Sequence, residues 1–323
     1  MIRAFVSDRG RLLAAADSRE ALPAAVWTDL VEPTAEERAA LESMLQVALP
    51  TREEMEEIEL SSRLYQENDA AFMTALFPSR TDTDDLLMGP VTFVLAGGKL
   101  VTVRHHTPRV FEVFPRRAEK VNLGCSNAEA VLLSLLEAMV DRLADVLERG
   151  QREVDRLSNE IFRTSTTPGD EIRPLRHVLE EVGRKGTLIS NLGNSLLTFR
   201  RVAGFLRQVM LQRGSNAEMR ERVATLARDI QSLSDHDEFL SQKVTFLLDA
   251  TLGMINIEQN GIIRIFTVAA AMFLPPTLVA SVYGMNFAHM PELGWVFGYP
   301  FALSLMVLSA VLPYWFFKRR GWL

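Results

Sequence analysis

The sequence predicts an α+β membrane protein with an N-terminal cytoplasmic α/β domain, a long helical stalk and two C-terminal transmembrane helices in each subunit. Three observations predict this fold class. Strand and hairpin patterns are confined to residues 1–125, and the chain from Asn127 onward reads almost wholly as helix. Residues 265–283 and 294–317 are 19 and 24 residues without a charge. A bilayer core of ~30 Å needs about 20 apolar residues in a helix, so both stretches are long enough to span it.

These patterns also place the boundaries of the expected parts. They are an α/β domain at 1–125, a long-helix bundle and stalk at 126–261, a first span at 262–283, a loop at 284–294, a second span at 295–317 and a basic cytoplasmic tail at 318–323. The short loop leaves almost no surface outside the membrane. The membrane part is therefore expected to act within the bilayer or at that loop.

Short runs rich in β-branched and aromatic residues predict the strands of the α/β domain. The runs are residues 25–31, 63–66, 71–77, 91–96 and 99–104. Gly97 and Gly98 separate the last two runs, and a two-residue glycine turn is typical of a β-hairpin. Thr34 and Thr51 are each followed three residues later by a glutamate. This is the spacing of a capping box, so a helix is expected to begin after each threonine.

Long helices are expected through the rest of the chain because apolar residues recur there at helical spacing. The first covers 128–162 and the second 172–211, with a turn at 164–170 between them. A polar break at 212–216 precedes residues 217–283, and these 67 residues at ~1.5 Å each make a rod of roughly 100 Å. The rod continues directly into the first span.

One face of this rod carries residues in alternating steps of three and four, a pattern that requires partner helices. The face consists of Leu226, Ile230, Leu233, Leu240, Val244, Leu247, Thr251 and Met254. Asp237 falls where the series calls for an apolar residue. The partners are helices of residues 128–211 in the same chain, copies of the rod in other subunits, or both, and the spacing does not choose between them.

Charges at the membrane boundary predict the orientation. Lys318, Arg319 and Arg320 close the second span and Arg264 opens the first, whereas the loop has no Lys or Arg. By the positive-inside rule both termini are cytoplasmic, and no signal peptide is expected because the N-terminus lacks an apolar run. A net charge of −6 with dispersed basic residues argues against nucleic-acid binding. The single cysteine, Cys125, excludes an intrachain disulfide and suits a reducing compartment.

Two spans cannot enclose a pore, so a transport protein of this design must oligomerise, with the first spans lining the axis. One face of the first span holds no ionisable side chain and ends at Gly284 and Asn286. Its members are Asn260, Ile263, Thr267, Ala270, Leu274, Thr277 and Ser281. The alternative is an ordinary packing face of small and aliphatic residues, as is common between membrane helices.

Several motifs stand at the two ends of the chain. The first span ends in Tyr-Gly-Met-Asn-Phe (residues 283–287), Met-Pro-Glu-Leu follows (290–293), and the chain closes with Lys-Arg-Arg-Gly-Trp-Leu (318–323). Together with the two-span topology, these motifs resemble the CorA family of magnesium transporters, whose signature is a Gly-Met-Asn triplet at the outer end of the first span. Residues 257–281 and 25–33 resemble the proteobacterial branch of that family.

The resemblance implies a homopentameric funnel in the bacterial inner membrane. Five α/β domains lead to stalk helices that become the pore-lining first spans, and the second spans face the lipid bilayer. The permeating ion is Mg²⁺, with Co²⁺ and Ni²⁺ as related substrates. We find no ATP-binding motif, and a divalent ion crossing ~100 mV inward gains about 4.6 kcal/mol, so the membrane potential is the expected driving force.

The same resemblance assigns roles to single residues. Gly284, Met285 and Asn286 form the selectivity filter, where neutral oxygens suit Mg²⁺ because this ion keeps its waters. Gly284 also suits a helix C-terminus, where glycine takes the left-handed conformation. Glu292 in the loop concentrates cations near the entrance. The residues expected to line and gate the pore are Asn260, Ile263, Phe266, Thr267, Ala270, Leu274, Thr277 and Ser281. Among them the threonines offer hydroxyls, and the apolar residues form a constriction that gates by dewetting.

Regulation is implied as well, since cytoplasmic carboxylates in this family bind Mg²⁺ between subunits and hold the pore closed. Mg²⁺ is thus both the transported ion and the expected regulatory ligand. Asp82, Asp84 and Asp85 precede the hairpin and Asp229 lies on the stalk, and carboxylates are suitable hard oxygen donors. The alternative is that these acids are solvated surface.

Two other functions compete with a gated magnesium channel. One is a related zinc or divalent-cation transporter of the ZntB type. Relatives with that role commonly depart from Met in the triplet and from Met-Pro-Glu-Leu, and this chain does not. The other is a membrane-anchored scaffold that transports nothing. An enzyme is not expected. A zinc enzyme in particular has little support, because the five histidines form no His-x-x-x-His pair and have no cysteine partners.

Overall fold

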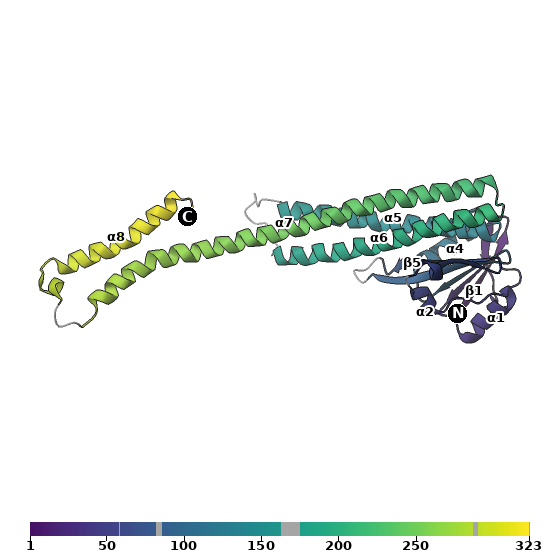
Figure 1. Ribbon diagram of the computed structural model, residues 1–323, viewed down its shortest axis with the longest axis horizontal. Coiled ribbons are helices and arrows are strands. Elements are labelled where there is room, and N and C mark those ends of the chain that lie inside the picture. The colour runs from purple at the N-terminus through teal and green to yellow at the C-terminus, as the bar shows by residue number, and fades with distance from the viewer. Residues whose placement is uncertain (58, 82–85, 163–174, 287–289, 323) are drawn as a thin grey trace. The chain divides into compact units, whose positions relative to one another are not determined.

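The computed structural model describes residues 1–323 except 58, 82–85, 163–174, 287–289 and 323 (Figure 1). The chain divides into two compact units, residues 1–171 with 180–248 and residues 172–179 with 249–323. The first unit contains a β-sheet and the long helices packed on it. The second contains the later part of the longest helix and the C-terminal helix.

A seven-stranded sheet forms the core of the first unit. Its strands are β1 (Ile2–Asp8), β2 (Arg11–Ala14), β3 (Trp27–Val31), β4 (Leu64–Glu67), β5 (Ala70–Ser79), β6 (Leu87–Ala96) and β7 (Lys99–Arg104). They lie in the order β2-β1-β3-β7-β6-β5-β4, and β3–β7 is the parallel pair. The predicted hairpin is confirmed. Gly97 and Gly98 have φ of 53° and 73°, and the turn pairs Ala96 with Lys99.

Two of these strands, β1 and β2, were not predicted from the sequence. Residues 63–66 were also predicted one residue early, because Arg63 ends the short helix α3 (Leu60–Arg63) and β4 begins at Leu64. Inside the sheet, the Trp27 ring stacks on Phe5 at 4.5 Å between ring centroids. Its indole N–H donates to Thr102 Oγ1 at 3.1 Å, so the buried polar end of the ring has a partner.

Both capping boxes form as predicted. Helix α1 (Ala35–Leu45) begins after Thr34, whose Oγ1 accepts the Glu37 N–H at 3.3 Å while the Glu37 carboxylate accepts the Thr34 N–H at 3.1 Å. Helix α2 (Arg52–Glu56) begins after Thr51 in the same way. These reciprocal bonds satisfy N–H groups that a helix start leaves without intrahelical partners. Helix α4 (Val110–Lys120), which has Pro115 inside it, was not predicted.

The remaining helices account for most of the chain. They are α5 (Ala128–Phe162), α6 (Leu175–Gln212), α7 (Ala217–Tyr283), the short 3₁₀ helix η1 (Pro291–Gly294) and α8 (Gly298–Arg319). The bounds of α5 and α7 agree with the predicted 128–162 and 217–283. The predicted turn at 164–170 lies outside the described residues. Helix α7 continues through two consecutive prolines, Pro275 and Pro276.

Helices α5, α6 and the first half of α7 run side by side in the first unit (Figure 1). Ion pairs join them, Lys185 to Glu153 between α6 and α5 and Arg222 to Glu137 between α7 and α5. We call the α7 residues from Leu226 to Leu247 in the three-and-four pattern the seam. Five of them are buried, namely Leu226, Ile230, Leu240, Val244 and Leu247. Helices of the same chain therefore supply partners for the seam.

Candidate ion pathway

The predicted pore-lining residues lie on α7, and every one of them is exposed in the protomer. We call this set the pathway face, and it consists of Asn260, Ile263, Phe266, Thr267, Ala270, Leu274, Thr277 and Ser281. Phe266 is 72% exposed and Leu274 67%, values that are high for large apolar side chains in a folded chain. Exposed contiguous apolar surface of this kind marks a place where lipid or another protein surface packs.

The two threonines of the pathway face have defined hydroxyl directions. Thr267 Oγ1 donates to the Ile263 carbonyl at 2.8 Å, and Thr277 Oγ1 donates to the Phe273 carbonyl at 2.7 Å. Each hydroxyl proton is thus used within the helix, and the oxygen keeps lone pairs for an outside donor. Such an oxygen can accept a hydrogen bond from a water molecule in the shell of a cation.

The Gly-Met-Asn triplet begins where α7 ends. The Gly284 N–H donates to the Ala280 carbonyl at 2.9 Å, which continues the helical pattern by one residue. The expectation of a left-handed Gly284 is wrong, since Gly284 is absent from the described glycines with positive φ. Space for a side chain is narrow at this position, because a Cβ at Gly284 would lie 3.1 Å from the Ala280 oxygen, tighter than nine in ten real Cβ contacts.

Met285 and Asn286 follow the helix end and are both exposed. The Asn286 side chain makes no hydrogen bond to any residue that the structure describes, so its amide oxygen is available to an incoming group. The backbone of Glu292 belongs to η1, between the two spans. The triplet and this acid are thus close in sequence, at the same end of the two long apolar helices.

The opposite end of the second unit gathers positive charge. In Figure 1, α8 runs back along the last part of α7 in the antiparallel direction. The Arg264 guanidinium lies 5.5 Å from the Trp322 ring centre, and that of Arg319 lies 3.5 Å from the Trp315 ring centre. The first of these contacts brings the start of the first span and the end of the second to one level. Basic and aromatic side chains together are typical of a membrane boundary.

The predicted regulatory acids are only partly described. Asp82, Asp84 and Asp85 lie outside the described residues. Asp229 lies on an exposed position of α7 in the first unit. It is not isolated, because its negative charge is one of several that act on Asp141 of α5.

Sequence reasoning missed a row of acids on α5 beside Asp229. Glu137, Asp141 and Asp145 are spaced by four residues and so lie on one helix face. Burial raises the pKa of the Asp141 carboxyl, the Arg117 guanidinium lowers it, and the charges of Asp145, Glu137 and Asp229 raise it again. The four-residue spacing of the three acids was the available signal, although exposed helices often carry it.

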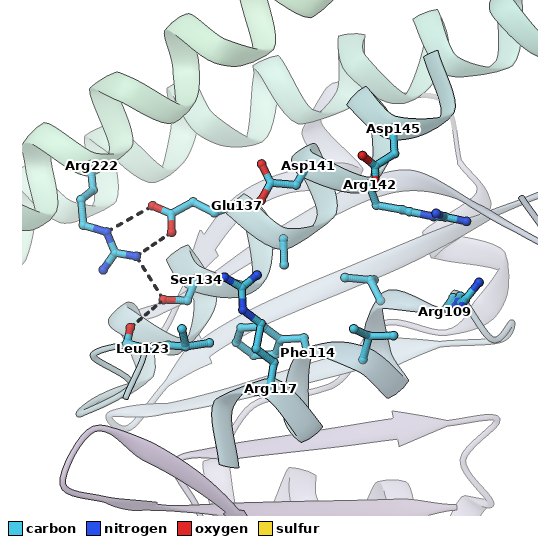
Figure 2. A pocket seen from close by; sticks show the side chains of 13 residues that line it. Arg109, Phe114, Arg117, Leu123, Ser134, Glu137, Asp141, Arg142, Asp145 and Arg222 are labelled. Atoms are coloured by element: carbon cyan, nitrogen blue, oxygen red, sulfur yellow. Dashed lines mark hydrogen bonds and ion pairs between the residues drawn. The ribbon is translucent and has the colours of Figure 1, made fainter. Parts of the chain in front are cut away.

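These acids line a pocket of about 600 Å³ between α4, α5 and the start of α7 (Figure 2). Its floor is apolar and includes Phe114 and Leu123. Arg222 of α7 donates to both Glu137 oxygens, at 3.1 and 2.7 Å, and to Ser134 Oγ at 3.1 Å. The pocket thus has basic groups facing its acids. Within the described part of the chain, no three His, Cys, Asp or Glu residues come together as a metal-binding group.

Comparison with known proteins decides the family. The model of the CorA-like Mg²⁺ transporter protein family matches residues 24–319. The chain belongs to this family. Magnesium transport protein CorA of Pasteurella multocida is 39% identical over the whole of both chains, and that of Escherichia coli strain K12 is 39% identical, again over both full lengths.

Solved structures of other proteins share the fold. The complete CorA magnesium transporter of Methanocaldococcus jannaschii has a TM-score of 0.77 at 18% identity, covering 100% of this chain and 99% of that one. The ZntB cytoplasmic domain of Vibrio parahaemolyticus has a TM-score of 0.55 at 9% identity, covering 79% of this chain and 97% of that domain. At these identities the likeness shows the fold alone.

The fold shared with the complete Methanocaldococcus jannaschii structure confirms the predicted fold class of an α/β domain, a long helix and two apolar C-terminal helices. Helices α7 and α8 are both long and apolar enough to cross a membrane, and the protein is a membrane protein of a magnesium-transporting family. The curated relatives are transporters rather than enzymes.

Proposed function

We propose that this protein is a gated channel for Mg²⁺ uptake, built from five copies whose α7 helices surround the ion path. The observation that carries the proposal is the pathway face, which is uncharged, exposed in the protomer and continuous with the Gly-Met-Asn triplet. A face of this kind is unsuited to the interior of a single chain. It suits a narrow path shared by several chains, in which polar oxygens alternate with apolar residues that control wetting.

The selectivity filter follows from the chemistry of the ion. Mg²⁺ holds its waters tightly, so a filter that reads the hydrated ion needs hydrogen-bond acceptors rather than charges. Five Gly284 carbonyls and five Asn286 side-chain oxygens would provide such a ring, with Met285 between them. Glu292 near the ring would raise the local cation concentration. Deeper along the path, the Thr267 and Thr277 oxygens would accept bonds from the same waters.

The membrane potential is proposed to drive the channel, and internal Mg²⁺ is proposed to control it. The membrane potential drives inward flow at about 2.3 kcal/mol per charge for 100 mV, and Co²⁺ and Ni²⁺ share the path. Both termini face the cytoplasm, where Mg²⁺ bound by Asp229 and the acids at 82, 84 and 85 favours the closed arrangement. A ligand shifts such an equilibrium only through its different affinities for the two states.

The test is Mg²⁺ uptake into proteoliposomes by wild type and Asn286→Ala. The variant removes an acceptor ring that binds the ion's waters, and bonds to charged species contribute about 1.5–3 kcal/mol each, so uptake should fall by at least about tenfold with assembly intact. Asn194→Ala, at an exposed position of α6, is the matched control and should transport normally. Normal uptake by folded Asn286→Ala would reduce the triplet to a helix end. Zinc uptake without magnesium uptake would favour a transporter of the ZntB type. If the protein took up neither ion, a scaffold without transport activity would be favoured.

A further inference from the structure

Asp237 is the one acid of the described α7 residues that lies buried in the seam. It occupies the place between Leu233 and Leu240 in the three-and-four series and is only 8% exposed. Its Oδ1 has no hydrogen-bond partner among the described residues. An ionised carboxylate buried to this extent loses most of its hydration, and no described donor compensates for this at Oδ1, which is unfavourable.

The facing helix leaves room for this carboxylate. Opposite Asp237 lies Gly193 of α6, and a Cβ built at Gly193 would come 2.5 Å from Asp237 Oδ2. The carboxylate therefore takes the volume that a side chain at position 193 would need. Glycine inside a helix costs about 1 kcal/mol relative to alanine, so the pair is accommodated at a cost to α6.

The charged groups around Asp237 are engaged with other partners. On α7 itself, His236 Nε2 is 3.0 Å from Gln151 Oε1 of α5, and Lys243 pairs with Asp155 of α5. On α6, the nearest ionisable residues to Gly193 are Lys185 and Arg200, two helical turns away on either side.

These two α6 residues and the α5 residues Arg149 and Arg152 also have partners. Lys185 pairs with Glu153, and Arg200 donates to the Gln231 amide oxygen at 3.4 Å. On α5, Arg152 pairs with Glu148 on an exposed surface. Arg149 is engaged as well. Burial alone raises the pKa of Asp237, to about 6, and no charge offsets it.

We propose that Asp237 and Gly193 form a proton-binding switch in the α6–α7 contact, closed when the Asp237 carboxyl is protonated and loosened when it is ionised. The neutral carboxyl fits the dry contact beside the glycine. The carboxylate requires water or a donor, and it gains one only by opening the contact. The bundle is thus held more tightly as its surroundings become acidic. This inference concerns the helix bundle and does not depend on which ion the protein conducts.

The sign of the effect follows from linkage. The folded-state pKa lies above the ordinary value of 3.8, so the folded protein binds more protons than the unfolded chain between these two values. The stability contributed by the neutral carboxyl is present below pH 3.8 and is lost as the pH rises through about 6. A shift of this size corresponds to roughly a hundredfold change in the unfolding equilibrium.

The experiment is thermal unfolding of the full chain in detergent from about pH 4 to pH 8, for wild type, Asp237→Asn and Asp235→Asn. Asp237→Asn keeps the shape without the ionisation. Relative to this variant, wild type should lose stability as the pH rises to about 6. Above about pH 6 the difference in stability between the two proteins should stay constant. Asp235 is exposed and accepts the Gln231 amide at 2.6 Å, so Asp235→Asn should follow wild type. A pH-independent difference between wild type and Asp237→Asn would overturn the proposal.

A second measurement tests the geometry without using pH. Gly193→Ala should destabilise wild type, because the new methyl group meets Asp237 Oδ2, and should be much less harmful in an Asp237→Ala background, where that space is empty. Equal losses in both backgrounds would show that Gly193 does not accommodate the carboxylate, and the switch would then be rejected.

Discussion

Helix α7 carries two faces with the same three-and-four spacing and opposite surroundings. In the first unit, seam residues such as Ile230 and Leu240 are completely buried. In the second unit, Ile263 and Leu274 of the pathway face are 60% and 67% exposed. The spacing of apolar residues therefore reports only that a face needs a partner. It does not say whether that partner belongs to the same chain.

The difference between the faces is explained by what the chain has available. In the first unit, α5 and α6 run beside α7 and cover the seam. In the second unit, one further long helix, α8, is available, and Val268 of α7 is buried there whereas the pathway face stays exposed. An apolar face that stays open after the chain has folded is left for lipid or for other copies. The absence of charge along it fits either surrounding, whereas the threonine oxygens favour a hydrated path.

Assembly is the largest effect that the comparison implies. If copies of the chain cover the pathway face, the protein in mild detergent should have a polypeptide mass of about 180 kDa, which is five times the chain mass of 36.3 kDa. Light scattering combined with refractive index measures this mass without the detergent contribution. A stable monomer or dimer in a detergent that preserves transport would contradict the shared path.

The same substitution in both faces separates their roles. Leu240→Ala removes a fully buried side chain from the seam and should cost about 2–5 kcal/mol in the free energy of unfolding, because the cavity remains unfilled. Leu274→Ala, made as its matched control, should change stability by less than about 0.5 kcal/mol. Denaturant unfolding of the full chain, followed by circular dichroism, measures both. An equal loss for Leu274→Ala would make the pathway face an ordinary packing face.

A smaller effect is expected from the acids proposed as regulatory ligands. Replacing Asp82, Asp84, Asp85 and Asp229 together by Asn removes the groups proposed to bind internal Mg²⁺, so the concentration that half-closes the channel should rise by roughly tenfold, a typical coupling. Flux from proteoliposomes loaded with graded Mg²⁺ measures this shift. Asp249→Asn, at an exposed position of α7, the helix that also carries Asp229, should leave the half-closing concentration unchanged. If the fourfold variant closes like wild type, the sensor lies elsewhere.

Much of the fold was predictable because its signals are local. The glycine pair of the hairpin, the two capping boxes and the long proline-free run of α5 each specify an element within a few residues. Strands β1 and β2 were missed because charged and small residues interrupt their apolar pattern. Helix α4 was missed because Pro115 lies inside it. Helix α4 packs against the sheet, and the local sequence does not reveal this packing.

The site was predictable to a different degree. The residues of the pathway face were identified from spacing and from family resemblance, and their roles remain predictions because the part of the chain that the structure describes leaves this face exposed. The row of Glu137, Asp141 and Asp145 was missed because such spacing is common on solvated helices. Asp237 was noticed as an exception to the seam, but its burial and the facing Gly193 required the packed helices to be known.

The two prolines of α7 have a consequence for the medium around the first span. Pro275 and Pro276 have no N–H, so the carbonyl oxygens of Ala271 and Met272 cannot accept the usual helical bonds from them. In hydrocarbon an unbonded carbonyl costs several kcal/mol, and carbonyls freed by proline in a membrane helix are satisfied by neighbouring helices, by Ser or Thr side chains, by ordered water or by local changes of the helix. The proline pair therefore calls for such a partner or adjustment at this level of the helix, which lipid chains do not supply.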